Sequence, residues 1–181
     1  MQYTVLDIET TGLSKYYHKI TEIAALKVKD KEIVDEFHTL INPKVLIPPF
    51  ITRLTGIDNK MVKDAPSISK IMPHFIDFLK EDPMVAHNAT FDHGFLSHNA
   101  LQQGYKFAND RICTRRLASR LLPDLTSKRL HCVCDHLKIN NIQEHRAMGD
   151  ALATHHIFLK MQDMIEKLEI KDVMKFQYSR H

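Results

Sequence analysis

The segment that most restricts the fold of this chain is Tyr3-Thr-Val-Leu-Asp-Ile-Glu9, a short apolar run with β-branched residues that ends at Thr10-Thr11-Gly12. Such a run predicts a buried strand. It contains two carboxylates, and a buried charge is costly unless a cation compensates it. Asp7 and Glu9 share one face of the strand, and their Cα atoms are about 6.6 Å apart, so both carboxylates could reach one cation. An outward-facing pair at the end of an edge strand is the alternative.

The order of elements along the rest of the chain predicts the fold class. We expect two more strands at 20–28 and 33–41, then a proline-broken connection, a helix from 67 to 82, a strand at 84–87, and helices at 91–104, 117–122 and 146–168. Three opening strands, followed by strands that alternate with helices, predict an α/β domain with a mixed sheet.

Composition limits the class of protein. The 181 residues carry a net charge of +3 and suit one domain with its own core. The five glycines lie at least ten residues apart, which excludes both the G-x-G-x-x-G and the G-x-x-x-x-G-K-[ST] nucleotide loops. Three cysteines, no export signal and no apolar run of about 20 residues lead us to expect a cytoplasmic protein that does not span a membrane.

Two later segments also place acids at the ends of core elements. In His87-Asn88-Ala-Thr-Phe91-Asp92 the aspartate follows a short strand, where it could also serve only to cap the next helix. In His145-Arg-Ala-Met-Gly-Asp150 the aspartate falls on the apolar stripe of the last helix and needs a partner, and the histidine could reach the same region.

Four carboxylates and one histidine from three segments suit two-metal hydrolysis. Two Mg²⁺ or Mn²⁺ ions about 3.5–4 Å apart need several hard oxygen ligands and stabilise both oxygens of an in-line displacement. A histidine can accept the proton of the attacking water.

These segments resemble the three motifs of the DEDDh family of 3′→5′ exonucleases, which includes the epsilon proofreading subunit of DNA polymerase III, exonuclease X, ribonuclease T and oligoribonuclease. The resemblance runs from Tyr3 to about Leu168. It implies a ribonuclease H-like fold, a five-stranded mixed sheet flanked by helices. We therefore expect an exonuclease domain at 1–168 and a short polar tail at 169–181.

The resemblance also implies residue roles. Asp7, Glu9 and Asp150 would hold the first of two divalent ions, Asp7 would bridge to the second, Asp92 would contribute largely through water, and His145 would be the general base. The positions that match those near the terminal nucleotide or the scissile phosphate are Thr10, Thr11, Gly12, Leu13, Leu54, Thr55, Asn88 and Phe91.

The chain departs from the commonest pattern at Ile112-Cys113-Thr114, where many members have Asp-Thr, and this version looks more like exonuclease X than like epsilon. The segment after Leu168 is also shorter than the polymerase-binding extension typical of epsilon. Neither departure affects a metal ligand, but both leave the subgroup and the substrate preference open.

Two other clusters need an interpretation. His131-Cys-Val-Cys-Asp-His136 suggests zinc, but its spacing on a helix separates the ligands, and Leu130, Val133, Cys134 and Leu137 form a core stripe instead. The basic run Arg111, Arg115, Arg116, Arg120, Lys128 and Arg129 could be a solvated helix face, but beside a phosphodiester-cutting site part of it should contact phosphate.

We therefore predict a metal-dependent 3′→5′ exonuclease that acts on single-stranded or frayed DNA in proofreading or repair and releases nucleoside 5′-monophosphates, with a DNA polymerase subunit as a possible partner. A 3′→5′ exoribonuclease is the alternative within the same class. An inactive exonuclease fold that tethers a polymerase or helicase is the alternative from another class.

Overall fold

The sheet is the centre of the fold. The computed structural model describes residues 2–141 and 144–178. Within these, five strands form one mixed sheet in the order β3-β2-β1-β4-β5. The strands are β1 (Gln2–Thr10), β2 (Ile20–Lys29), β3 (Glu32–Leu40), β4 (Met84–Ala86) and β5 (Arg111–Cys113).

The first three strands are antiparallel neighbours, as predicted. Asp30 and Lys31 form the two-residue turn between β2 and β3, and both have positive φ (52° and 74°), as a type I′ hairpin turn requires. β4 pairs parallel to β1, and β5 pairs parallel to β4. Parallel neighbours need long crossover connections, and the helices supply them.

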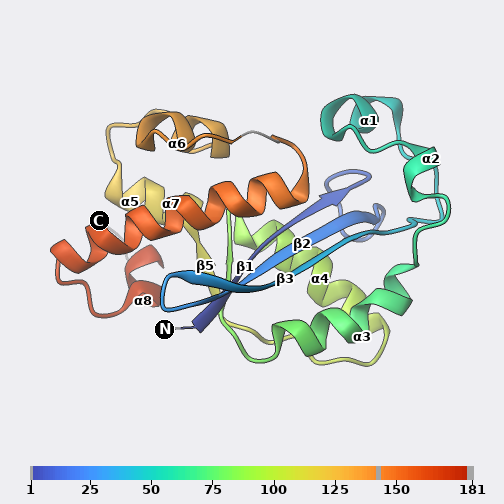
Figure 1. Cartoon of the computed structure of the whole chain (residues 1–181), viewed down its shortest axis with the longest axis horizontal. Helices are drawn as coiled ribbons and strands as arrows, with labels where there is room; N and C mark the ends of the chain where they lie inside the picture. The colour runs from blue at the N-terminus through green and yellow to red at the C-terminus, as the bar shows by residue number, and fades with distance from the viewer. Residues whose placement is uncertain (1, 142–143, 179–181) are drawn as a thin grey trace.

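Helices cover both faces of the sheet (Figure 1). They are α1 (Pro49–Thr55), α2 (Asn59–Val62), α3 (Ile68–Leu79), α4 (Ala89–Gln102), α5 (Thr114–Leu121), α6 (Leu130–Leu137), α7 (Ala147–Lys167) and α8 (Val173–Tyr178). The helices α5, α6 and α7 pack on one face, and α3 and α4 pack on the other. Among the described residues, no helix combines the length and apolarity needed to cross a membrane.

The side chains of β1 alternate between the two cores. Tyr3 and Val5 lie in the core beneath α7, where the Tyr3 ring packs edge-on against Phe158, whereas Leu6 and Ile8 lie in the core beneath α3 and α4. Because strand side chains alternate, Asp7 and Glu9 continue the α7 face. The central strand thus directs both acids toward the last long helix.

Helices α1 and α2 are not among the elements that we predicted. They follow the proline-broken connection and stand at the end of the sheet where β1 ends (Figure 1). Pro49 opens α1, and Gly56, with φ of 74°, ends it. These helices enclose a small core of their own, made of Ile47, Ile51, Ile57 and Val62.

The segment that we expected to be only a short polar tail contains α8, which packs against α5 and β5. Gln177 is buried: its Oε1 accepts a hydrogen bond from the Cys113 N–H at 2.8 Å, and its Nε2 donates to the Arg111 carbonyl at 2.8 Å. The Gln177 side chain thus pairs with the backbone of the edge strand β5. The polar composition of this segment gives no indication of such pairing.

Two local expectations have different outcomes. Val133, Cys134 and Leu137 are buried on α6, so the predicted core stripe is confirmed. Adjacent histidines such as His155 and His156 predict a helix surface, and this prediction is wrong for His155: it is buried on α7, and burial lowers its pKa to about 4.

Candidate active site

Three predicted metal ligands meet at the end of β1. Asp7 and Glu9 come from β1 and Asp150 from the first turn of α7, and one carboxylate oxygen of each lies within 4.8 Å of the other two. Asp150 is 7% exposed, so the prediction that it lies on the buried stripe is confirmed. The fold therefore brings together acids that are more than 140 residues apart in the sequence.

These acids repel one another. Burial raises the pKa of Asp7 well above its usual range, and the charges of Asp92 and Glu9 raise it further. Burial, then the charges of Asp150 and Glu22, raises the pKa of Glu9 to about 9. Carboxylates held this close are stabilised when a cation binds between them.

Asp92 comes from the first turn of α4, the helix that packs on the other face of the sheet from α7, and is 2% exposed. Burial raises its pKa to about 7, although hydrogen bonds from its own backbone N–H and that of Ile8 act in the opposite direction. The bond to Ile8 ties α4 to the strand that carries Asp7 and Glu9. Asp92 is not part of the group of three acids within 4.8 Å, although its charge acts on both Asp7 and Glu9.

Asp150 is oriented by two neighbours. Asn141 Nδ2 donates to Asp150 Oδ1 at 2.8 Å, and the backbone N–H of His145 donates to Oδ2 at 3.1 Å. Burial raises the pKa of Asp150, and the hydrogen bond from Asn141 counteracts that rise. Sequence reasoning missed Asn141, and no signal in the chain marked it.

The predicted general base lies at the edge of the site. The His145 side chain is 47% exposed, with Nε2 3.7 Å from Glu144 Oε1, and the residue has a φ of 63°. Its backbone contacts Asp150, whereas its imidazole lines a pocket that Asp150 shares. The imidazole therefore lies in the same pocket as Asp150, and its charge lowers the pKa of that acid.

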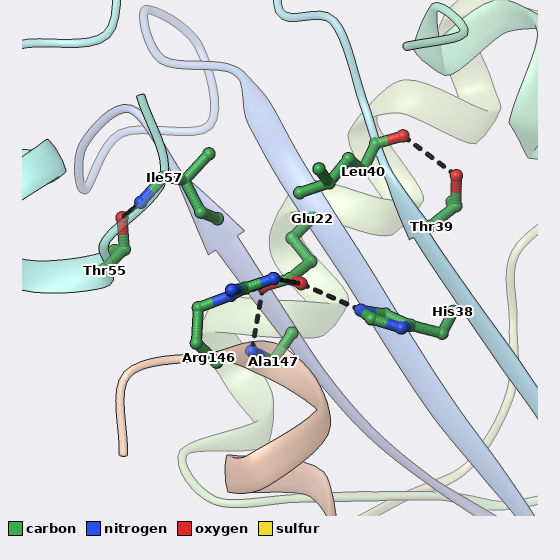
Figure 2. A network of polar contacts seen from close by, with 8 residues as sticks. All are labelled: Glu22, His38, Thr39, Leu40, Thr55, Ile57, Arg146 and Ala147. Atoms are coloured by element: carbon green, nitrogen blue, oxygen red, sulfur yellow. Dashed lines mark hydrogen bonds and ion pairs between the residues drawn. The ribbon is translucent and has the colours of Figure 1, made fainter. Parts of the chain in front are cut away.

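A fifth acid, Glu22, supports the site from β2 (Figure 2). It is fully buried and faces Glu9 across the β1–β2 register. Its carboxylate accepts hydrogen bonds from the Arg146 guanidinium at 2.7 and 3.1 Å and from the Ala147 N–H at 3.0 Å, and it lies 2.8 Å from His38 Nε2. These bonds lower its pKa despite burial. Sequence reasoning missed Glu22, although an acid inside the apolar run 20–28 was a signal that could have identified it.

The predicted nucleotide-binding residues after β1 form a tight loop. Thr10 Oγ1 donates to the Gly12 carbonyl at 2.6 Å, and Thr11 Oγ1 accepts from the Lys19 N–H at 3.0 Å. A Cβ on Gly12 would lie 2.3 Å from the His18 ring, so any other residue here requires that ring to move. Both threonine hydroxyls are used within the loop, and Leu13 projects from it with 85% of its surface exposed.

The other predicted substrate-binding residues differ in how exposed their side chains are. Leu54 on α1 is 52% exposed, whereas Thr55 is buried and ends the helix: its Oγ1 donates to the Ile51 carbonyl and accepts from the Ile57 N–H (Figure 2). Phe91 is partly buried on α4 and packs against Phe95. Thr55 therefore has a structural role in the loop, while Leu54 remains available to a ligand.

A pocket of about 420 Å³ opens beside the acids, within the size range of ligand sites. Its lining residues are His87, Asn88, Arg115, Arg129, Leu130, His131, Glu144, His145 and Asp150. Asn88, predicted to lie near the scissile phosphate, is thus in the same pocket as the predicted general base.

The donor set fits divalent cations. Carboxylate oxygens are the ligands that Mg²⁺ and Mn²⁺ prefer, and the raised pKa values show that the four acids lack sufficient compensation from the protein. The nearest arginine, Arg146, is bonded to Glu22. Hard cations are therefore the natural partners of this cluster.

Comparison with known proteins agrees with the site. The exonuclease family RNase_T matches residues 4–158. The chain is 43% identical over 172 residues to a PolC-type DNA polymerase III of Caldanaerobacter subterraneus subsp. tengcongensis and 41% identical over 168 residues to that of Bacillus subtilis strain 168. These matches cover 95% and 91% of this chain but only 12% of each relative.

Solved structures show the same fold. Exonuclease X in complex with 5′ overhanging duplex DNA has a TM-score of 0.75 at 26% identity, covering 97% of this chain and 99% of that one. Escherichia coli exonuclease I with a dT13 oligonucleotide has a TM-score of 0.81 at 17% identity, covering 93% and 42%, and supports the fold alone. The ribonuclease H-like fold is confirmed, and the chain belongs to the RNase_T family as a DEDDh-type 3′→5′ exonuclease.

Proposed function

We propose that this exonuclease removes nucleoside 5′-monophosphates from the 3′ end of single-stranded or frayed DNA, with two divalent ions and His145 as general base. The observation that carries the proposal is the meeting of Asp7, Glu9 and Asp150 within 4.8 Å, with Asp92 buried beside them. The presence of all four acids and the histidine favours catalysis over a non-catalytic tethering role.

In this mechanism Asp7, Glu9, Asp92 and Asp150 would hold the divalent ions. When bound, Mg²⁺ or Mn²⁺ would stabilise the negative charge on the attacking and leaving oxygens. Side chains of the protein hold the substrate and accept the proton in the remaining steps.

Leu13 and Leu54 would hold the terminal base, because both are exposed and apolar. Nε2 of His145 would accept a proton from the attacking water as its oxygen bonds to phosphorus. The bond between phosphorus and the 3′ oxygen of the preceding nucleotide breaks, and that oxygen takes a proton from solvent water. The products are a nucleoside 5′-monophosphate and a strand with a new 3′ hydroxyl.

DNA is the proposed substrate because the relatives near 40% identity are DNA polymerases and the exonuclease X structure contains DNA. We also propose that the domain acts as a proofreading unit beside a DNA polymerase. Since the chain spans 12% of its PolC relatives, the rest of that protein type would supply polymerisation.

Matched oligomers of DNA and RNA, labelled at the 5′ or the 3′ end, test the proposal with Mg²⁺, Mn²⁺ or a chelator. We expect 5′-labelled DNA to shorten stepwise and 3′-labelled DNA to release a labelled mononucleotide at once, in either metal. Faster degradation of RNA would favour the exoribonuclease alternative. Full activity in chelator would contradict the metal requirement, and no cleavage of either polymer would contradict the proposed function.

A further inference from the structure

The basic run between Arg111 and Arg129 divides between two surfaces. The Arg116 guanidinium lies 4.7 Å from the centre of the Tyr178 ring, and that of Arg120 lies 5.2 Å from the Phe176 ring, so both cover α8. Arg115 and Arg129 instead line the pocket that contains Asp150. Two of the cationic side chains therefore face the candidate active site.

A partly buried histidine, His87, contacts both segments of the backbone that carry these two arginines. His87 Nε2 lies 2.8 Å from the Lys128 carbonyl, and Nδ1 lies 2.9 Å from Thr114 Oγ1. A carbonyl can only accept, so Nε2 carries the hydrogen, and Nδ1 of the neutral ring accepts from the threonine hydroxyl. Thr114 precedes Arg115, and Lys128 precedes Arg129. One ring therefore links the two segments of chain that carry Arg115 and Arg129.

Neither arginine has an acidic partner within the part of the chain that the structure describes. The acid nearest to them in the pocket lining, apart from Asp150, is Glu144, whose Oε1 lies 3.6 Å from His131 Nδ1 and 3.7 Å from His145 Nε2. Two exposed guanidinium groups that line one pocket without a carboxylate partner suit phosphate, which arginine binds through two parallel N–H donors.

The pocket also indicates which part of a substrate lies there, on the basis of the proposed function. Leu13, Leu54 and Phe91, the residues proposed to contact the terminal nucleotide, do not line it. Asp150 and His145, which the proposed function places next to the bond that is cut, do line it. We infer that Arg115 and Arg129 bind the backbone phosphates of the strand immediately 5′ of the scissile bond.

The test removes one phosphate charge at a time. Four single-stranded DNA oligomers are compared: one with normal linkages, and three with a neutral methylphosphonate at the first, second or third linkage 5′ of the scissile bond, which itself stays a phosphodiester. The first cleavage by the wild type, Arg115→Ala and Arg129→Ala is measured as kcat and KM. Arg116→Ala, on the same helix but facing Tyr178, is the matched control.

We expect the wild type to lose roughly tenfold in kcat/KM on an oligomer with a methylphosphonate at a contacted linkage, the effect of one charge-assisted hydrogen bond. Arg115→Ala and Arg129→Ala should lose a similar factor on the normal oligomer, mostly in KM. Each variant should then show almost no further penalty from the methylphosphonate at the linkage that its arginine contacts.

The inference is overturned if both variants behave like Arg116→Ala, or if they keep the full methylphosphonate penalty at all three linkages. Both arginines are exposed, so melting temperatures should match that of the wild type and confirm that the variants are folded. Cleavage of the normal oligomer by the wild type separates this result from the proposed function: without that cleavage the proposed function itself has failed.

Discussion

Arg146 binds both carboxylate oxygens of Glu22, with Nη2 2.7 Å from Oε1 and Nε 3.1 Å from Oε2. Glu22 lies on β2 and Arg146 immediately precedes α7, so the pair fixes the start of the helix against the sheet. His145 precedes Arg146, and the backbone N–H of Asp150 donates to the Arg146 carbonyl. The position of the last motif therefore depends on an acid outside all three motifs.

Glu22→Gln should lower both stability and kcat. Breaking a buried ion pair lowers the free energy of unfolding by roughly 3–5 kcal/mol. The loss in Glu22→Gln should lie at the low end of this range, because glutamine can still accept the hydrogen bond from the Ala147 N–H. The kcat should decrease because Asp150 and His145 lose their anchor. Thermal melting and oligomer cleavage measure the two effects. Glu36→Gln, an exposed acid on β3, is the control and should change neither. Unchanged kcat in Glu22→Gln would show that the pair does not position the site.

Asp7→Asn should abolish cleavage and yet stabilise the metal-free protein. Burial, and then the charges of Asp92 and Glu9, oppose ionisation of the Asp7 carboxyl in the folded state. Asparagine carries no ionisable group, so the folded state no longer bears that cost. We expect a gain of roughly 1 kcal/mol, or about 2–4 °C in melting temperature for a chain of this size. Mg²⁺ should raise the melting temperature of the wild type but not that of the variant. Asp77→Asn on α3 should leave both properties unchanged, and a less stable metal-free Asp7→Asn protein would contradict the repulsion argument.

The stability of the metal-free protein should fall between pH 7 and pH 9. Glu9 keeps its proton up to about pH 9 in the folded state, whereas a carboxyl group in the unfolded chain loses it near pH 4. The folded state then binds more protons, so the free energy of unfolding falls as pH rises toward the folded pKa. His87 and His155, whose pKa values are lowered to about 4, give the opposite slope only below about pH 6.5.

Melting curves of the wild type and of Glu9→Gln in chelator isolate this effect, because the groups that do not interact with Glu9 cancel in the difference. The advantage of Glu9→Gln over the wild type should grow from pH 7 to pH 9. Mg²⁺ should stabilise the wild type more at pH 9 than at pH 7, since it then displaces fewer protons. A constant difference between the two proteins across this range would contradict the raised pKa of Glu9.

The elements that could be predicted from the sequence are those with a long stretch of periodically spaced apolar residues. The strands β1 to β3 and the helices α3 and α7 have it, and the structure contains each of them. Helices α1 and α2 were missed because they are only seven and four residues long and follow a proline-broken segment. Helix α8 was missed because Gln177 holds it to β5 through hydrogen bonds, which have no periodic signature.

The acids at the site were predictable because a carboxylate inside an apolar run requires a partner. The same argument applies to Glu22, whose partner Arg146 lies within the last motif but 124 positions away in the chain. Asn141 could not be predicted, since only the folded loop brings its amide to Asp150. The division of the arginines between α8 and the pocket likewise depends on the direction of each side chain on α5.

His145→Ala should lower kcat by roughly 10²- to 10⁴-fold, the usual effect of losing a general base. The ring is exposed and only its backbone N–H contacts Asp150, so oligomer binding should be nearly unchanged. Because residue 145 has a φ of 63°, which asparagine tolerates better than alanine, His145→Asn should give the same kinetic loss with less effect on stability. His131→Ala, in the same pocket, is the control, and an equal loss of kcat there would contradict the assignment of the base to His145.

Gly12→Ala should disturb substrate binding through the loop that carries Leu13. The new Cβ would lie 2.3 Å from the His18 ring, whose Nδ1 accepts the Ser14 N–H at 3.1 Å, so the ring must move and that bond is lost. We expect a higher KM and a slightly lower melting temperature. Gly94→Ala is the matched control, because its Cβ would meet only Lys15 Cδ at 3.6 Å, and it should stabilise α4 by roughly 0.5–1 kcal/mol. Adding His18→Ala to Gly12→Ala removes the obstructing ring and should recover part of the KM. A KM in Gly12→Ala equal to that of the wild type would show that the loop does not position the terminal nucleotide.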